Sequence, residues 1–226
     1  MPDGMTFSSL MSDVQAYLER GTVIDPIVFA QLPKLINNAE RRISRGVKIL
    51  GFQRPLTNNF TAGSPLMPKP DRWRETISFN FGRFNPKTGQ YTRRTPLYER
   101  SYEFLRGFWP DDSVVGMPCF YADYDYNNWV VAPTPDQNYP FEVMFWELPA
   151  LLDASNTQNW ISIYAPEVLL YSTLLECSPF LKNDERIPVW EALFNEGMRA
   201  LSNEDIQDMV GRATETRQSV TTGGPP

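Results

Sequence analysis

Apolar side chains recur at helical spacing along the first fifty residues. The first stripe follows Thr6, which suits a helix N-cap, and ends before Gly21. Its members are Phe7, Leu10, Met11, Val14 and Leu18. A second stripe starts at Asp25 and Pro26, and we expect Pro33 to interrupt and restart it. It continues through Leu35, Ile36, Ala39, Ile43 and Val47. Two N-terminal helices are therefore predicted.

After Gly51 the chain alternates between apolar and polar residues, as strands do. In WRETISFNF the alternation predicts one face made of Trp73, Glu75, Ile77, Phe79 and Phe81. The turn-like NPKTGQ at 85–90 predicts a returning strand, and Thr95 and Pro96 suit the start of a short helix. We expect that helix to bury Tyr98, Tyr102 and Leu105. Three more strands are predicted at 119–125, 129–133 and 141–148, and their short loops favour an antiparallel meander.

Helical spacing returns after Asn159. The segment from Pro166 to Leu175 is apolar on nearly every side, which predicts a helix buried between others. Asp184 suits the cap of the next helix, whose stripe is Ile187, Trp190, Phe194, Met198 and Leu201. Ser202 or Asn203 suits the cap of a last helix that presents three apolar residues to a partner, namely Ile206, Met209 and Val210. We expect the small, polar C-terminal end to be disordered in the free subunit.

Together these segments predict an α+β fold. Its helical bundle of N-terminal and C-terminal helices is interrupted by an inserted antiparallel β-sheet region. The predicted parts are bundle helices at 1–50, a β-rich region with one short helix at 51–150, bundle helices at 151–210 and a flexible tail at 211–226. No stretch approaches the roughly 20 apolar residues that a membrane span needs, and the N-terminus lacks a signal-peptide layout. We therefore expect a cytosolic chain.

Histidine is absent from all 226 residues. Its absence excludes any Ser-His, Cys-His or His-metal site and any imidazole proton shuttle. Cys119 and Cys177 lack CxxC spacing, so we expect two reduced, buried thiols. Among catalytic sites, those that use only carboxylates remain compatible with this composition.

Two carboxylate arrangements can be compared with known sites. Asp123, Asp125 and Asn127 match positions 1, 3 and 5 of a calcium loop, but Asn128 stands where glycine is needed and Thr134 where glutamate is needed. The pair Glu142 and Glu147, or the pair Asp123 and Asp125, could serve a glycosidase, although neither comes with a signature. We therefore predict no catalytic, cofactor-binding or metal-binding residue.

Charge is unevenly distributed along the chain, whose net charge is −6. Residues 1–106 hold 16 Lys or Arg against 9 acids, whereas residues 107–181 hold 10 acids and no basic residue. Such segregation suits contacts between opposite surfaces of identical copies, or a passage to which polyanions must not adhere. The arginines predicted to contact a neighbouring subunit are Arg41, Arg42, Arg45, Arg93 and Arg94. The acids predicted to line such a passage are Asp111, Asp112, Asp123 and Asp125.

The C-terminal half resembles the head-to-tail adaptor (connector) proteins of tailed bacteriophages. The resemblance rests on the order of an APTPD hairpin, a strand ending in a P..L element, an N.W before an apolar helix, and LKNDERIPVWEALF. LPKLINNAERRISR near the N-terminus is similar to an early helix of the same family. The likeness covers residues 6–210 and is weakest at 52–95.

This resemblance implies a structural virion protein without catalysis, assembled in the host cytoplasm. It implies a ring of twelve copies in the neck of the virion, with the portal protein above, a tail or nozzle protein below, and double-stranded DNA passing without specific binding or membrane contact. It also places portal docking in the C-terminal segment, on Asn203, Ile206, Met209, Val210, Arg212 and Arg217. Two alternatives stay open: another ring-forming tail or neck component, and a carboxylate-dependent, carbohydrate-active virion enzyme.

Overall fold

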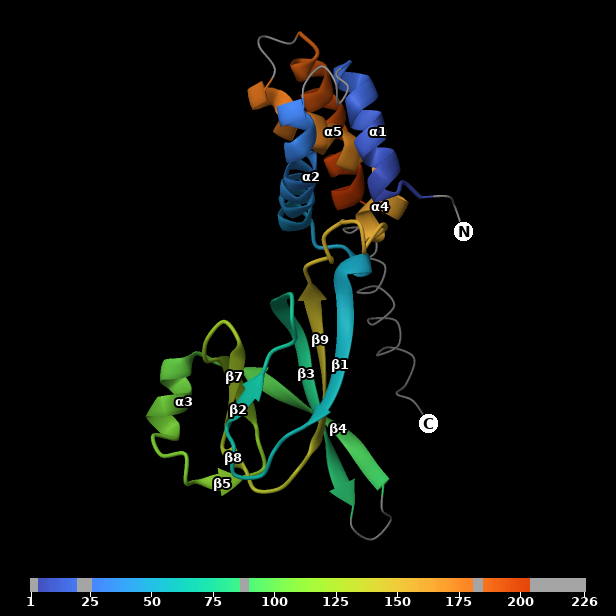
Figure 1. Ribbon diagram of the computed structural model, residues 1–226. Helices are drawn as coiled ribbons and strands as arrows, with labels where there is room; N and C mark the ends of the chain where they lie inside the picture. Colours follow the sequence, from blue (N-terminus) through green and yellow to red (C-terminus); the bar gives the residue numbers. More distant parts are fainter. Residues whose placement is uncertain (1–3, 20–25, 86–89, 181–184, 204–226) are drawn as a thin grey trace. The chain divides into compact units, whose positions relative to one another are not determined.

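The computed structural model describes residues 4–19, 26–85, 90–180 and 185–203. The chain divides into two compact units. The helical unit combines the segments before Gln53 and after Leu148, and the β-rich unit is Gln53–Leu148. This arrangement confirms the predicted α+β class, with helices at both ends of the chain and a sheet between them (Figure 1).

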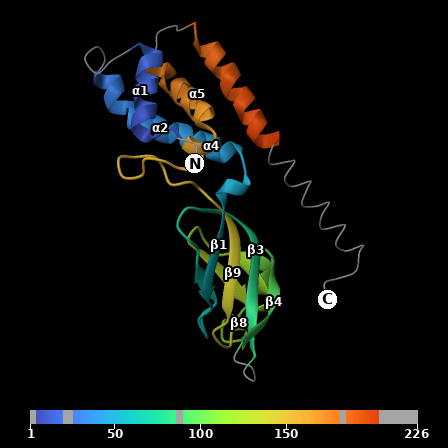
Figure 2. The ribbon, with the colours of Figure 1, turned by 90° about the vertical axis from the view of Figure 1, so that its right-hand side faces the viewer.

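The helical unit is built around α5. Its elements are α1 (Phe7–Leu18), α2 (Pro26–Gly46), η1 (Leu50–Phe52), α4 (Trp160–Tyr164), α5 (Pro166–Cys177), η2 (Ser178–Phe180) and a helical segment at 187–203. Thr6 caps α1 as predicted, accepting a hydrogen bond from the Ser9 backbone in a capping box. Figure 2 shows α5 between the two N-terminal helices and the segment at 187–203. The burial of α5 on most sides follows from this position.

Pro33 does not interrupt the second helix, contrary to the prediction. Helix α2 runs unbroken from Pro26 to Gly46 with Pro33 inside it. A proline inside a helix costs about 3 kcal/mol through a lost hydrogen bond and a steric clash. The buried stripe that spans the proline offsets this cost, because Leu32, Leu35, Ile36, Ala39 and Ile43 are all removed from water.

The C-terminal helical segment packs directly on α5. Trp190, Phe194 and Leu201 are buried, as the predicted stripe requires. A Cβ atom on Gly197 would lie 2.6 Å from Cγ2 of Val168, so glycine permits the close approach of the two helices. Ser202 and Asn203 lie within this helical segment, and the last helix predicted to follow them lies outside the described residues. The predicted caps Asp25 and Asp184, Gly21 and the predicted tail lie outside the described residues.

The β-rich unit contains a curled seven-stranded sheet. Its strands are β1 (Gln53–Asn59), β2 (Leu66–Pro68), β3 (Trp73–Asn85), β4 (Gln90–Glu99), β6 (Phe120–Asp123), β7 (Asn128–Ala132) and β9 (Pro140–Glu147). Their order is β1-β9-β3-β4-β6-β7-β2. All neighbours pair antiparallel except β4 and β6, which makes the sheet mixed. The short strands β5 (Val115–Gly116) and β8 (Thr134–Pro135) form a separate parallel pair.

The strand connectivity differs from a simple meander. Strands β6 and β7 form the expected antiparallel hairpin, but β9 crosses to the far side of the sheet and pairs with β1 and β3. The apolar inner faces then enclose one core, which includes Phe60, Met67, Phe79, Phe81, Tyr121, Trp129, Phe141, Val143 and Phe145. Burial of this aromatic cluster, rather than loop length, decides where β9 pairs.

The predicted single face of β3 is broken by two irregularities. Its pairing with β9 shifts between Trp73 and Glu75 and again between Thr76 and Ser78. Each shift changes which residues point inward, since side chains alternate with a period of two. Ile77 is consequently exposed, whereas the Thr76 hydroxyl accepts hydrogen bonds from the indole nitrogens of Trp73 (3.2 Å) and Trp129 (3.1 Å).

The short helix begins later than predicted. Thr95 and Pro96 belong to β4, and α3 (Tyr102–Phe108) is capped by Ser101. Pro96 is tolerated because β4 pairs with β6 only from Tyr98 onward and is therefore an edge strand at the proline. Leu105 is buried as expected, but Tyr98 and Tyr102 are exposed.

Candidate interaction surfaces

The arginines of α2 form one exposed face of the helical unit. Arg41, Arg42 and Arg45 lie opposite the buried stripe of α2, as the period of 3.6 residues requires. With Asn38, Gly46 and Glu176 they line a shallow hollow of about 610 Å³. We call Lys34, Arg41 and Arg45 the arginine face, because these residues are exposed and share one side of the helix.

Arg42 lies at the edge of this face and is held by two contacts. Its Nη1 atom is 3.5 Å from Oε1 of Glu176, and its guanidinium lies 4.9 Å from the ring centroid of Phe194. Arg42 therefore ties α2 to α5 and to the C-terminal helix. Arg41 donates to the side chain of Asn38 at 3.4 Å.

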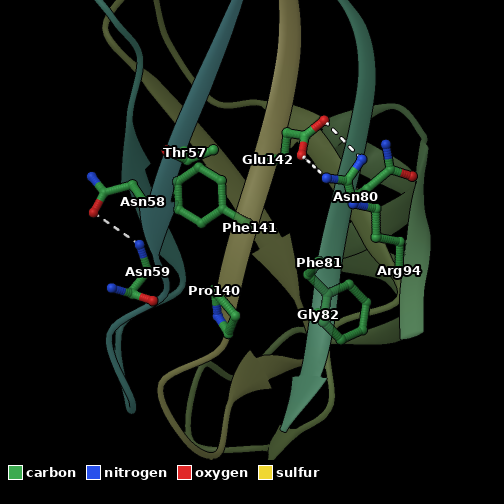
Figure 3. Close-up of a pocket in the computed structure, with 10 residues that line it drawn as sticks. All are labelled: Thr57, Asn58, Asn59, Asn80, Phe81, Gly82, Arg94, Pro140, Phe141 and Glu142. Carbon is green, nitrogen blue, oxygen red and sulfur yellow. Dashed lines mark hydrogen bonds and ion pairs between the residues drawn. The ribbon is translucent and has the colours of Figure 1, made fainter. Parts of the chain in front are cut away.

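Arg94 belongs to β4 and lies on the outer face of the sheet. Its guanidinium binds the Glu142 carboxylate through both oxygens, at 2.6 and 3.2 Å (Figure 3). The pair borders a shallow hollow of about 580 Å³ that is also lined by Thr57, Asn58, Asn59 and Asn80. The side chain of Arg93 lies outside the described residues.

Of the acids predicted to face DNA, Asp111 and Asp112 follow α3. Asp112 is paired with Arg106, on the last turn of α3. Asp111 accepts a hydrogen bond from the Ser113 backbone at 2.9 Å, and this bond lowers the pKa of its carboxyl. Both acids are exposed.

Asp123 is the last residue of β6, and Asp125 belongs to the turn that connects β6 and β7. Asp125 accepts hydrogen bonds from the side chain of Asn128 and from backbone N–H groups, which lower the pKa of its carboxyl. Asp123 is paired with Lys69, whose Nζ atom lies 2.8 Å from its carboxylate. Lys69 was not predicted, and its ammonium group places a positive charge beside both carboxylates.

The two acidic pairs lie beside different ends of α3. Tyr124, between Asp123 and Asp125, contacts Tyr102 at the first residue of the helix, with 5.7 Å between ring centroids. Asp112 instead contacts the last turn of the helix. The four predicted acids thus belong to one part of the β-rich unit but form two separate groups.

The structure separates the nominal glycosidase pair. Glu142 and Glu147 are five residues apart on β9, which corresponds to about 16 Å at the usual rise of a strand. A glycosidase needs its two carboxyl groups roughly 5–10 Å apart. Each carboxylate is moreover bound by arginine: Glu142 by Arg94, and Glu147 by Arg54 and Arg72. Within the described ranges no three Asp, Glu or Cys side chains gather as a metal site would require.

The tyrosines near α3 form a surface that the sequence did not single out. Tyr102, Tyr124 and Tyr126 have exposed fractions of 36, 44 and 73 %. Glu99 and Glu103, also exposed, adjoin them in the chain. We call these five residues the tyrosine surface. The alternation of aspartate and tyrosine in DYDY was the available signal, because it places both residue types on one turn.

Of the two cysteines that were predicted to be buried, only one is buried. Cys177 is buried, and burial raises the pKa of its thiol to about 12. Cys119 is exposed, contrary to the prediction, because it precedes β6 at the surface of the sheet. Of the predicted portal-binding residues, Asn203 is exposed and is the last residue that the structure describes. Ile206, Met209, Val210, Arg212 and Arg217 lie outside the described residues.

Charged and aromatic side chains are exposed on both units. In the part of the chain that the structure describes, no helix is long and apolar enough to cross a membrane. Comparison with protein families gives a match to the SU10 adaptor protein family over residues 5–219, nearly the whole chain. A comparison with curated proteins gave no match. The chain therefore belongs to the SU10 adaptor protein family, a family of phage adaptors.

Membership of this family confirms the resemblance read from the sequence. It implies a structural virion adaptor, which binds other virion components, and it points to a non-catalytic role.

Proposed function

We propose that this adaptor assembles into a ring that joins the portal to the tail and continues the DNA channel. The match to the adaptor family over residues 5–219 carries the proposal. The resemblance to the family implies that the ring contains twelve copies. It also implies that the ring lies in the neck of the virion, between the portal protein and a tail or nozzle protein. The chain acts there through repeated contacts and breaks no covalent bond.

Three sets of residues have separate roles in this proposal. Portal binding is assigned to Asn203, Ile206, Met209, Val210, Arg212 and Arg217. Contacts between neighbouring copies are assigned to Arg41, Arg42, Arg45, Arg93 and Arg94. The channel wall is assigned to Asp111, Asp112, Asp123 and Asp125, whose negative potential repels the phosphates of passing DNA. The exposure of all four acids is consistent with that role.

A mass measurement tests the ring. The purified chain is mixed with the portal protein of its own phage, and the complexes are weighed by native mass spectrometry and imaged by electron microscopy. We expect multiple copies of the adaptor on each portal ring. A chain that never joins the portal would contradict the proposal. An image that places all four aspartates on the outer wall would contradict the channel assignment alone.

A further inference from the structure

The arginine face of α2 and the tyrosine surface have complementary chemistry. Residues 26–48 hold five basic residues and one acid, Glu40, which is fully buried. Residues 99–126 hold six acids and two basic residues. The two segments therefore present opposite net charges on exposed side chains.

The aromatic rings add a second form of complementarity. Tyrosine and arginine are over-represented among the residues that dominate binding energy at protein interfaces. A guanidinium group is attracted to the face of an aromatic ring as well as to a carboxylate. Tyr126, exposed over 73 % of its surface, is available for such a contact, and Glu103 supplies a carboxylate on the neighbouring helix α3.

We infer that the arginine face of one copy binds the tyrosine surface of the next copy. The inference rests on the proposed ring and names the surface that receives the arginines. Because the two faces are different, the contact is heterologous, and repeated heterologous contacts close into a ring when the rotation permits. The occupant of each face is thus a second copy of this chain. Tyr124 and Tyr126 alternate with Asp123 and Asp125 at the end of β6 and in the turn that follows. The same segment can therefore contact a neighbouring copy and face the channel.

Charge reversal tests the contact. The basic variant pair is Arg41→Glu with Arg45→Glu, and the acidic variant pair is Glu99→Arg with Glu103→Arg. Self-association of each double variant and of the wild type is measured by sedimentation velocity over a range of protein and salt concentrations. We expect each double variant alone to raise the dissociation constant at least about tenfold, because like charges then oppose each other. Association of the wild type should weaken with added salt.

Mixing the two double variants is the decisive measurement. In the mixture, the unaltered arginine face of one variant binds the unaltered tyrosine surface of the other, which gives a heterodimer. The reversed arginine positions can then bind the reversed glutamate positions, so oligomers larger than a heterodimer should return. The matched control is Glu191→Arg with Glu196→Arg, two exposed glutamates of the C-terminal helix. This control should associate alone as the wild type does. When it is mixed with the Arg41→Glu, Arg45→Glu variant, that variant should end the growing oligomers, because its reversed arginine face binds no tyrosine surface. Circular dichroism melting confirms that every variant is folded.

Several outcomes overturn the inference. Unchanged association of both double variants, with a wild type that associates, would place the interface elsewhere and leave the ring intact. A variant that changes melting temperature but not sedimentation would indicate a contact within one chain. A wild type that stays monomeric at every concentration would show that these faces do not suffice for association. The ring itself would then be judged by the mixture with the portal.

Discussion

The Nζ atom of Lys69 lies 2.8 Å from Oδ1 of Asp123, and this contact fastens the chain after β2 to the β6–β7 turn. The same nitrogen donates to the backbone carbonyl of Asp125 at 2.9 Å and lies 3.6 Å from the ring centroid of Trp73. The Lys69 side chain is only 2 % exposed, whereas that of Asp123 is 52 % exposed. The lysine is therefore enclosed, and its carboxylate partner is half in water.

Replacement of Lys69 by methionine should destabilise the β-rich unit. The change removes a charge-assisted hydrogen bond and a cation–π contact, and it leaves the Asp125 carbonyl without its lysine donor. Asp123 can still be solvated, so we expect a loss of about 2 kcal/mol in unfolding free energy, below the usual cost of breaking a fully buried pair. Urea unfolding followed by tryptophan fluorescence measures it.

Lys34→Met is the matched control for Lys69→Met. Lys34 is exposed on α2, so its replacement should alter the unfolding free energy by less than about 0.5 kcal/mol. Equal effects of the two substitutions would show that enclosure of Lys69 contributes nothing.

Helices were predictable because their apolar stripes are contiguous in sequence. The stripe of α1, that of α2 and that of the C-terminal segment each provide buried residues at the predicted positions, such as Leu10, Ile36 and Trp190. The prediction at Pro33 was wrong because it considered only the local cost of a proline in a helix. Burial of apolar residues on the turns before and after Pro33 outweighs that cost.

The sheet was less predictable because its pairings are distant in sequence. Thr76 points into the core only because β3 carries two shifts in pairing against β9. Lys69 pairs with Asp123, which lies 54 positions further along the chain, and nothing in MPKPDRW indicates a buried lysine. The alternation of apolar and polar residues therefore predicted where the strands lie in the sequence. It could not predict which strands pair, and this pairing determines which residues are exposed.

Two helical glycines should respond oppositely to alanine. In Gly197→Ala the new Cβ would meet Val168 at 2.6 Å, so the C-terminal helix must move away from α5. We expect this variant to lose about 1–3 kcal/mol despite the better helix propensity of alanine. In Gly107→Ala the Cβ meets nothing within 4 Å, so helix propensity alone should stabilise α3 by up to about 1 kcal/mol.

Chemical denaturation of both glycine variants beside the wild type measures these changes. Because each substitution adds the same methyl group to a helix, the difference between them isolates the contact with Val168. A Gly197→Ala variant as stable as Gly107→Ala would show that the close packing of the C-terminal helix on α5 is absent in solution.

Removal of residues 203–226 should abolish portal docking and leave both units folded. The deleted segment contains all the residues assigned to portal binding, and the buried core residues that the structure describes all precede it. Co-sedimentation with portal rings measures docking, and circular dichroism measures folding. The matched control removes only residues 220–226, beyond the segment that matches the adaptor family, and should dock normally. Full docking by the longer deletion would assign portal binding to another surface.

Glu40 is a buried carboxyl group that connects α2 to the chain after β9. Its carboxylate accepts hydrogen bonds from the Leu152 backbone at 3.0 Å and from the side chain of Asn159. The Asn37 amide, in the orientation that satisfies both of its ends, donates to the same carboxylate at 3.2 Å. Burial outweighs these donors and raises the pKa of Glu40 to about 7.

The raised pKa of Glu40 makes the helical unit more stable in mild acid. Between pH 4.5 and 7 the folded chain keeps a proton that the unfolded chain has released, so unfolding free energy falls as pH rises. The wild type should lose up to about 3 kcal/mol across this window from Glu40, with little further loss above it. Glu40→Gln should lack this component, whereas Glu191→Gln, at an exposed position, should keep it. Urea unfolding at a series of pH values compares the three chains. Parallel curves for the wild type and Glu40→Gln would show that Glu40 keeps an ordinary pKa, and hence that its donors compensate fully for burial.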